Sequence, residues 1–227
     1  MTRDDKIFAG IIVGFLLLWA TFCFAETFRI TGSSYTWDTY VSYNAQTTNF
    51  GNAATMSVRD AYGSMVRISL LKFDLSDLSG TVTTAYCSLY VDAGDCGEVY
   101  IVSSRMITDW NEMEATWDTA KTSPELDWVS GEISASDFTQ NSDTITVNAT
   151  DDWFVWDVTP IVATQVSTST NYGIALWATP PSTDDCNQLL HTENQGTHYP
   201  ILYGEYTTGG EGGVVVKKAY LKQVKLP

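Results

Sequence analysis

Tyrosine and tryptophan side chains on predicted strands are the groups in this sequence best suited to contact a ligand. Tyr86 and Tyr90 alternate with apolar residues in segment 83–91, and Tyr100 and Trp177 do so in segments 97–104 and 173–179. Because successive side chains of a strand point to opposite faces, these rings are expected to face outward. Exposed rings can stack on sugars, so Tyr90, Tyr100 and Trp177 are the candidates for binding a glycan. The alternative is that they lie on two different sheets or beneath a long loop.

The sequence offers little for catalysis. Its two histidines, His191 and His198, follow no nucleophile turn, and we find neither a glycine-rich phosphate loop nor a metal-ligand spacing. A glycosidase with paired carboxylates is an alternative, because the chain has 27 Asp and Glu residues. Nothing in the sequence places two of them opposite each other, so we expect no enzymatic activity.

Four acidic residues in the segment after the strand at 97–104 could bind a cation: Asp109, Glu112, Glu114 and Asp118. They could equally be solvated acids or helix caps. Calcium needs several converging oxygen ligands, and the sequence shows no loop with the spacing that identifies such a site. Calcium is therefore an open possibility, and no cofactor is certain.

The cysteines after residue 25 divide into one strand residue and two loop residues. Cys87 has the inward parity of its strand and is expected to be a buried free thiol. Cys96 and Cys186 each stand just before a predicted strand. A disulfide between them is the natural expectation in an oxidising compartment, although sequence alone leaves their proximity open.

Short strand patterns separated by turn residues indicate an all-β jelly-roll sandwich with one short helix and a long irregular loop. In segment 64–74 both parities are apolar, which predicts a central strand, followed by a turn and a hairpin-like pairing with segment 83–91. The helix is expected after Val158, with Thr159 as a possible cap. The loop covers 105–143. The strands are expected at 36–43, 54–59, 64–74, 83–91, 97–104, 144–149, 153–158, 173–179, 187–192 and 199–206.

A series of short motifs resembles the DNRLRE domain, also described as a carbohydrate-binding module family. The motifs are DTYVS at 38–42, NFG at 49–51, LLKFDLSDLSG at 70–80, TAYCSLYV at 84–91, DWNE at 109–112, ATW at 115–117, DVT at 157–159, NYGIAL at 171–176 and YPILYGEY at 199–206. The resemblance implies a jelly-roll β-sandwich that binds extracellular polysaccharides. It also implies that the DWNE region folds over one end of the sandwich, where Trp110 and Trp117 are expected to plug that end.

The two ends of the chain differ in composition from the segment between them. Residues 1–25 combine a short charged start with an apolar run and small residues at Cys23 and Ala25, which is typical of a signal peptide. An uncleaved membrane anchor is the alternative, although the run is short for a bilayer of ~30 Å. Residues 26–207 are the expected domain. Residues 208–227 form a glycine-rich linker and a basic tail, which is either disordered or a contact for a protein partner.

The charge of the chain limits the class of partner. The formal net charge is −15, with 12 basic residues against 27 acidic ones. Such a protein repels nucleic acid and anionic membranes, so neutral glycans, divalent cations or basic surfaces are better partners. A membrane would be contacted only through the N-terminal segment, if that segment is not cleaved.

Together these patterns predict a secreted or cell-surface, non-catalytic protein that binds a polysaccharide or cell-surface glycan. The alternative is a structural or adhesive component of the cell surface or envelope, such as a filament or surface-assembly subunit, without specific glycan binding. The first requires an exposed aromatic platform. The second requires a surface or tail that is complementary to another chain.

Overall fold

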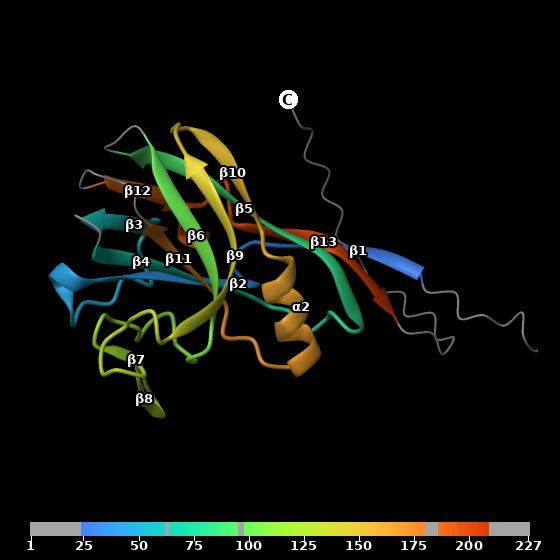
Figure 1. Ribbon diagram of the computed structural model, residues 1–227, viewed down its shortest axis with the longest axis horizontal. Helices are drawn as coiled ribbons and strands as arrows, with labels where there is room; N and C mark the ends of the chain where they lie inside the picture. Colours follow the sequence, from blue (N-terminus) through green and yellow to red (C-terminus); the bar gives the residue numbers. More distant parts are fainter. Residues whose placement is uncertain (1–23, 62–63, 95–97, 180–185, 209–227) are drawn as a thin grey trace, which may run out of the picture.

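The computed structural model describes residues 24–61, 64–94, 98–179 and 186–208 (Figure 1). This part of the chain contains thirteen strands, one α-helix and two short 3-10 helices. The helices are η1 (Tyr43–Ala45), α2 (Thr159–Thr168) and η2 (Glu193–Gln195). The strands are β1 (Phe24–Thr31), β2 (Thr36–Ser42), β3 (Thr55–Ala61), β4 (Ser64–Phe73), β5 (Thr81–Gly94), β6 (Val99–Met106), β7 (Thr119–Thr122), β8 (Glu125–Asp127), β9 (Phe138–Val147), β10 (Asp152–Asp157), β11 (Ile174–Thr179), β12 (Cys186–His191) and β13 (Ile201–Thr208).

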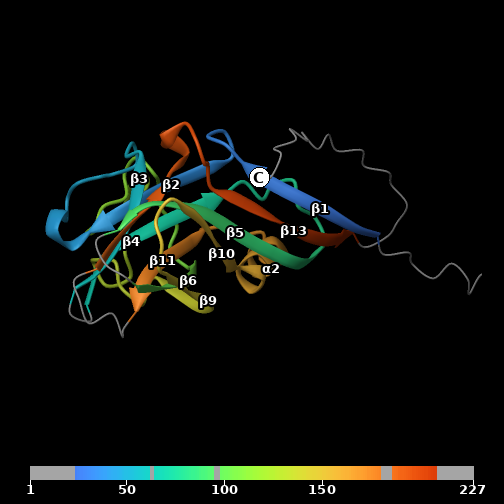
Figure 2. The same ribbon diagram turned by 90° about the horizontal axis from the view of Figure 1, so that it is seen from above.

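Eleven strands form one curled antiparallel sheet in the order β1-β13-β5-β12-β3-β4-β11-β6-β9, with β10 paired to β5 and β2 paired to β4. β3 is where the sheet turns, because it pairs with β12 along its length but with β4 only near its end. The two halves enclose a large apolar core to which β5, β12 and β13 contribute from one side and β4, β6 and β11 from the other. The predicted all-β sandwich with one short helix is confirmed. Figure 2 shows β1 and β13 side by side, extending from one end of the molecule.

The predicted central strand is confirmed, but its predicted pairing is wrong. In β4, Leu71 and Phe73 lie in the large core, whereas Ile68 and Leu70 lie in a second apolar cluster on the opposite face. β4 and β5 are not neighbours in the sheet. The turn between them instead carries the chain across from one half of the sandwich to the other, with Gly80 at a φ of 114°.

The second apolar cluster joins the long loop to the outer face of one half of the sandwich. The tryptophans of this loop pack with their neighbours on Val41 of β2, Ile68 and Leu70 of β4 and Ala175 of β11. The buried tryptophans are Trp110, Trp117 and Trp128. Trp110 and Trp117 are therefore buried, as expected, but the expectation that they plug one end of the sandwich is wrong, because they cover a sheet face.

Thr159 has a different role from the predicted cap. It is the first residue of α2, whose N-cap is Val158, and no side-chain hydrogen bond caps the helix there. Its Oγ1 instead accepts a hydrogen bond of 2.8 Å from the Ala85 amide on β5. Ile161 and Val162 of α2 lie in the large core, so the helix closes that part of the sandwich.

Most predicted strands appear within a few residues of their predicted bounds. β1, β7, β8 and the first half of β9 were not predicted. β7, β8 and that half of β9 carry no clear alternation of apolar residues, whereas β1 does, with Phe28 and Ile30 packed on the large core. No helix in the described ranges is long and apolar enough to cross a membrane. The predicted signal peptide or anchor up to residue 23, the tail from residue 209 and Cys96 lie outside the described residues.

Candidate functional site

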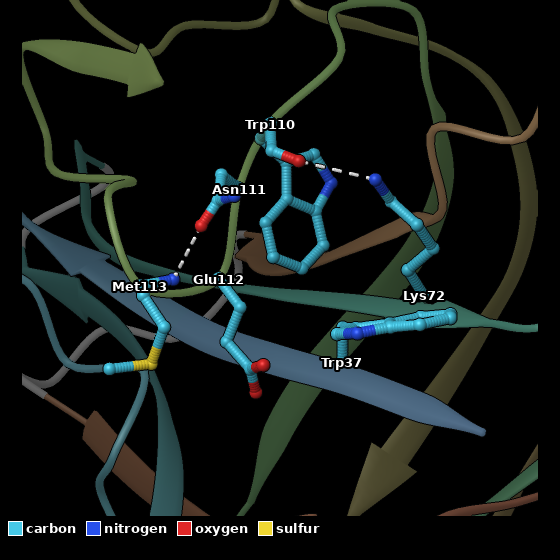
Figure 3. Close-up of a pocket in the computed structure, with 6 residues that line it drawn as sticks. All are labelled: Trp37, Lys72, Trp110, Asn111, Glu112 and Met113. Carbon is cyan, nitrogen blue, oxygen red and sulfur yellow. Dashed lines mark hydrogen bonds between the residues drawn. The ribbon is translucent and has the colours of Figure 1, made fainter. Parts of the chain in front are cut away.

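An open cleft of about 410 Å³ lies between β2, β4 and the first turn of the long loop (Figure 3). Its volume is in the range of small-ligand sites. Trp37 of β2 keeps 39% of its surface exposed, which is unusual for tryptophan. Figure 3 shows the Trp37 ring and the Glu112 carboxyl group reaching toward the same space below Trp110. The lining residues are Trp37, Lys72, Trp110, Asn111, Glu112 and Met113.

The alternation of β2 places Trp37 in this cleft. Its neighbours Thr36 and Asp38 are both 1% exposed, so Trp37 points away from them to the outer face. On that face it lies opposite Lys72 of β4 in the strand register. Because β4 is a central strand held on both sides, the Trp37 ring has a rigid support.

The other wall of the cleft is the segment 110–113, which the NFG motif holds in place. The Asn49 side chain donates hydrogen bonds of 2.7 and 2.9 Å to the carbonyl oxygens of Glu112 and Ala115. Gly51 approaches the same segment so closely that a Cβ atom there would lie 2.3 Å from the Glu112 carbonyl oxygen. Trp110 donates from its indole Nε1 to the Tyr172 carbonyl oxygen over 2.7 Å.

Three carboxyl groups meet behind the cleft, those of Asp38, Glu112 and Glu193. The Asp38 amide donates to Glu112 Oε1 over 3.0 Å, and the Glu193 amide donates to Asp38 Oδ2 over 2.8 Å. Burial raises the pKa of Asp38 to about 8, and the nearby carboxylates of Glu112 and Glu193 add to this effect. Burial likewise raises the pKa of Glu112 to about 7. At neutral pH this cluster therefore holds protons that ordinary carboxylates have lost.

The lysine of the cleft shares one acidic residue with a second lysine. Lys72 Nζ lies 3.2 Å from Asp109 Oδ1, and Lys121 contacts the other oxygen of the same carboxylate. Burial alone would raise the pKa of Asp109, but the two lysines outweigh it and hold that pKa below its usual value. Lys72 Nζ also lies 4.9 Å from the centre of the Trp110 ring, within the range of a cation–π contact.

This arrangement is suited to binding a sugar. The half-exposed face of Trp37 can stack on a pyranose ring, and Asn111 and Glu112 can form hydrogen bonds with hydroxyl groups. Glu112 and Glu193 influence each other's pKa, which is consistent with their carboxyl groups lying close together.

The structure places Tyr90 on a different half of the sandwich from the other two predicted stacking residues. Tyr90 is half-buried on the outward face of β5, and its ring is stacked on His198 with 4.1 Å between centroids and 9° between planes. Trp153 of β10 and His191 of β12 also contact it. One face of the Tyr90 ring is therefore already covered.

Tyr100 and Trp177 share one outer face, which also carries Trp37. In the strand register Trp177 lies opposite Val102 and Thr179 lies opposite Tyr100, so the two rings are diagonal neighbours. Both are half-buried. Trp177 donates from Nε1 to Ser104 Oγ over 2.9 Å and packs against Phe138 at the edge of the second apolar cluster. Their part in binding stays a prediction.

The acidic residues considered for calcium are engaged in other contacts. Asp109 binds two lysines, and Glu114 accepts hydrogen bonds from the amides of Thr122 and Ser123. Within the described ranges, no group of three or more His, Cys, Asp or Glu side chains could hold a metal ion. Calcium binding remains a prediction.

One cysteine prediction is confirmed and the other stays a prediction. Cys87 is a buried free cysteine, as predicted. The pairing of Cys96 with Cys186 falls outside the described residues, since Cys96 is not described and only the backbone of Cys186 is.

The sequence analysis did not select Trp37, although the alternation of its predicted strand indicates that it faces outward. Trp37 directly precedes the DTYVS motif in a strand that was predicted at nearly the right bounds. Its parity is opposite to that of Asp38, so the same alternation argument that selected Tyr90 would have placed it outside. Asn111 and Met113 could not have been identified, because only the folded loop brings them to Trp37.

Comparison with known proteins identifies the family of this fold and cleft. A search of curated proteins found no match to the chain. The model of carbohydrate-binding module family 96 matches residues 30–203, which include Trp37, the long loop and both halves of the sandwich. The chain therefore belongs to carbohydrate-binding module family 96.

Proposed function

We propose that this protein is a secreted, non-catalytic module that binds a polysaccharide in the Trp37 cleft. The observation that carries this proposal is the half-exposed Trp37 ring beside Asn111 and Glu112, in a cleft of suitable size. Membership of a carbohydrate-binding family supports the same class of ligand. The composition of residues 1–25 supports export from the cytoplasm.

The overall charge of the protein favours a neutral glycan. Beside the cleft, Lys72 and Lys121 share the single carboxylate of Asp109, and the raised pKa values of Asp38 and Glu112 leave these acids partly protonated at neutral pH. The net charge of −15 nevertheless repels an anionic polymer as a whole. Hydroxyl groups of a neutral sugar can donate to Glu112 when it is ionised and accept from it when it is protonated.

Retention of the full chain on a panel of insoluble neutral and acidic polysaccharides tests the proposal, with calcium and again with a chelator. Wild-type protein is expected to bind at least one neutral glycan, and Trp37→Ala is expected to weaken that binding about tenfold or more, since buried stacking contacts dominate such interfaces. Tyr35→Ala is the matched control, because Tyr35 is 52% exposed two residues away and does not line the cleft.

The outcomes separate the candidate functions. Equal binding by Trp37→Ala and wild type would exclude the cleft. Folded wild-type protein that binds no glycan on the panel would instead favour the structural or adhesive role at a cell surface. Loss of binding in chelator alone would support calcium as a cofactor.

A further inference from the structure

The outward face of β13, β5 and β10 carries a second set of aromatic rings, on the half of the sandwich that does not hold the Trp37 cleft. The rings form two rows. In the first row Tyr203 of β13 lies opposite Tyr86 of β5, with 5.6 Å between ring centroids and 32° between planes. In the second row Tyr90 of β5 lies opposite Trp153 of β10. Both rows therefore face away from the large core.

The second row is held rigidly by its own contacts. The Trp153 ring lies edge-on to Tyr90 at 5.6 Å and edge-on to His198 at 5.8 Å. His198, stacked on Tyr90, has a φ of 52°, which few residues other than glycine adopt. Trp153 is thus the ring of this row that remains half-exposed without another ring stacked on its face.

The spacing of the two rows suits an extended chain. Tyr86 and Tyr90 are four residues apart on β5, which corresponds to about 13 Å at the rise of an antiparallel strand. Between the rows lie the smaller side chains of Ser88 and Val155, which are opposite each other in the register. Val155 is 40% exposed and Ser88 only 7%, so Val155 is the accessible part of the strip between the rows.

The charges on this face restrict the ligand. Asp157 lies opposite Tyr86, Asp152 precedes Trp153, and the carboxylates of Asp92 and Asp151 help to raise the pKa of Tyr90 after the effect of burial. Arg29 of β1, opposite Tyr203, is the basic residue on these rows. Carboxylates accept hydrogen bonds from hydroxyl groups but repel an anionic chain, so the face suits a neutral sugar polymer.

We propose that the Tyr86–Tyr203 and Tyr90–Trp153 rows form a second binding surface, on which an extended neutral polysaccharide lies along β5. This inference rests on the proposed carbohydrate-binding function but concerns a different surface from the Trp37 cleft. A module with contact surfaces on both halves of its sandwich would hold two segments of one polymer or two neighbouring polymers.

The test measures the affinity of the full chain for a long soluble neutral polysaccharide that wild-type protein binds. Trp153→Ala and Tyr203→Ala are each expected to lower this affinity about tenfold. Val155→Arg is a second kind of variant, because it places a long side chain between the rows at an exposed position where folding tolerates it. It is expected to reduce affinity similarly. Tyr35→Ala, on the other half of the sandwich, is the matched control and is expected to bind as wild type does.

The result also distinguishes the two surfaces. Wild-type affinity in Trp153→Ala, Tyr203→Ala and Val155→Arg, with Trp37→Ala impaired, would overturn the second surface and leave the cleft in place. Normal affinity in Trp37→Ala, with the other three impaired, would support the second surface and exclude the cleft. Failure of wild-type protein to bind any neutral glycan would overturn both.

Discussion

Asp38 is an acidic side chain enclosed by protein. It is 1% exposed, its Oδ2 accepts a hydrogen bond from the Glu193 amide, and within the described ranges its Oδ1 has no hydrogen-bond partner. The neighbours that influence its pKa are the acids Glu112 and Glu193, and no lysine or arginine is among them in the part of the chain that the structure describes. Burial of this kind destabilises the ionised form of a carboxyl group, which is why the pKa of Asp38 rises to about 8.

This raised pKa predicts that acidification stabilises the fold over a defined range. The unfolded chain has an Asp pKa near 4, so the folded protein binds the proton more tightly. The contribution of Asp38 is therefore fully present below about pH 4, and it is lost as the pH rises to about 8. We expect the free energy of unfolding by urea to fall between pH 5.5 and 8.5.

Asp38→Asn should reduce this pH dependence, because the asparagine side chain is neutral at every pH. Its side-chain oxygen can still accept the hydrogen bond from the Glu193 amide. One pKa unit corresponds to about 1.4 kcal/mol, so the variant should gain on the order of several kcal/mol relative to wild type at pH 8.5 and little at pH 5. Asp127→Asn on the exposed strand β8 is the control. A wild-type slope in Asp38→Asn would contradict the account.

At the scale of elements, the long loop acts as a cover for the outer face of β2 and β4. Trp117 is 5% exposed in the second apolar cluster and donates from Nε1 to Glu132 over 3.0 Å, yet it does not line the cleft. Trp117→Ala should therefore lower the free energy of unfolding by about 3–5 kcal/mol through the cavity it leaves. Chemical denaturation measures this, and Trp117→Phe should recover a large part of the loss. A loss below about 1 kcal/mol would mean that the loop adds little to the fold.

Gly51 permits the NFG turn and the segment 110–113 to approach each other closely. A Cβ atom there would lie 2.3 Å from the Glu112 carbonyl oxygen, so Gly51→Ala must push apart the NFG turn and the segment that forms the cleft wall. We expect a loss of about 1–3 kcal/mol in stability together with weaker glycan binding. Asn52→Ala, at the exposed neighbouring position, should stay within about 0.5 kcal/mol of wild type. Unchanged stability and binding in Gly51→Ala would show that this approach is not required.

The elements that could be predicted from sequence are those with a clear apolar pattern. β2, β5 and β11 alternate, β4 is apolar on both faces, and the predicted bounds of all four lie close to those observed. Strand pairing could not be predicted in the same way. The turn after β4 allows either a hairpin or a crossing between the two halves, and the crossing lets Leu71 and Phe73 share one core with residues of β5. β7 and β8 form only because the long loop folds back on itself.

At the scale of the whole molecule, the sequence predicts which side chains face outward but not which of them lie together in the candidate site. Parity correctly placed Tyr90, Tyr100 and Trp177 away from the large core, but it could not say that Tyr90 lies on one half of the sandwich and the other two on the opposite half. That information is contained in the strand order. The cleft, likewise, joins Trp37 to residues more than 70 positions later in the chain.

The net charge of −15 is also a property of the whole chain, and it predicts how salt affects stability and binding. Repulsion among the carboxylates opposes the compact state, and salt screens it as the Debye length falls from about 30 Å at 0.01 M to about 10 Å at 0.1 M. The melting temperature at pH 7.5 should therefore rise over this range. Near the isoelectric point of about 4.2 the effect should be much smaller.

Binding should follow the same electrostatics. Affinity for a neutral polysaccharide should change little between 0.01 and 0.1 M salt, because no charges are brought together, whereas any weak affinity for an acidic polysaccharide should increase as repulsion is screened. Affinity for an acidic polymer that falls as salt is added would instead reveal a local basic surface that outweighs the overall charge.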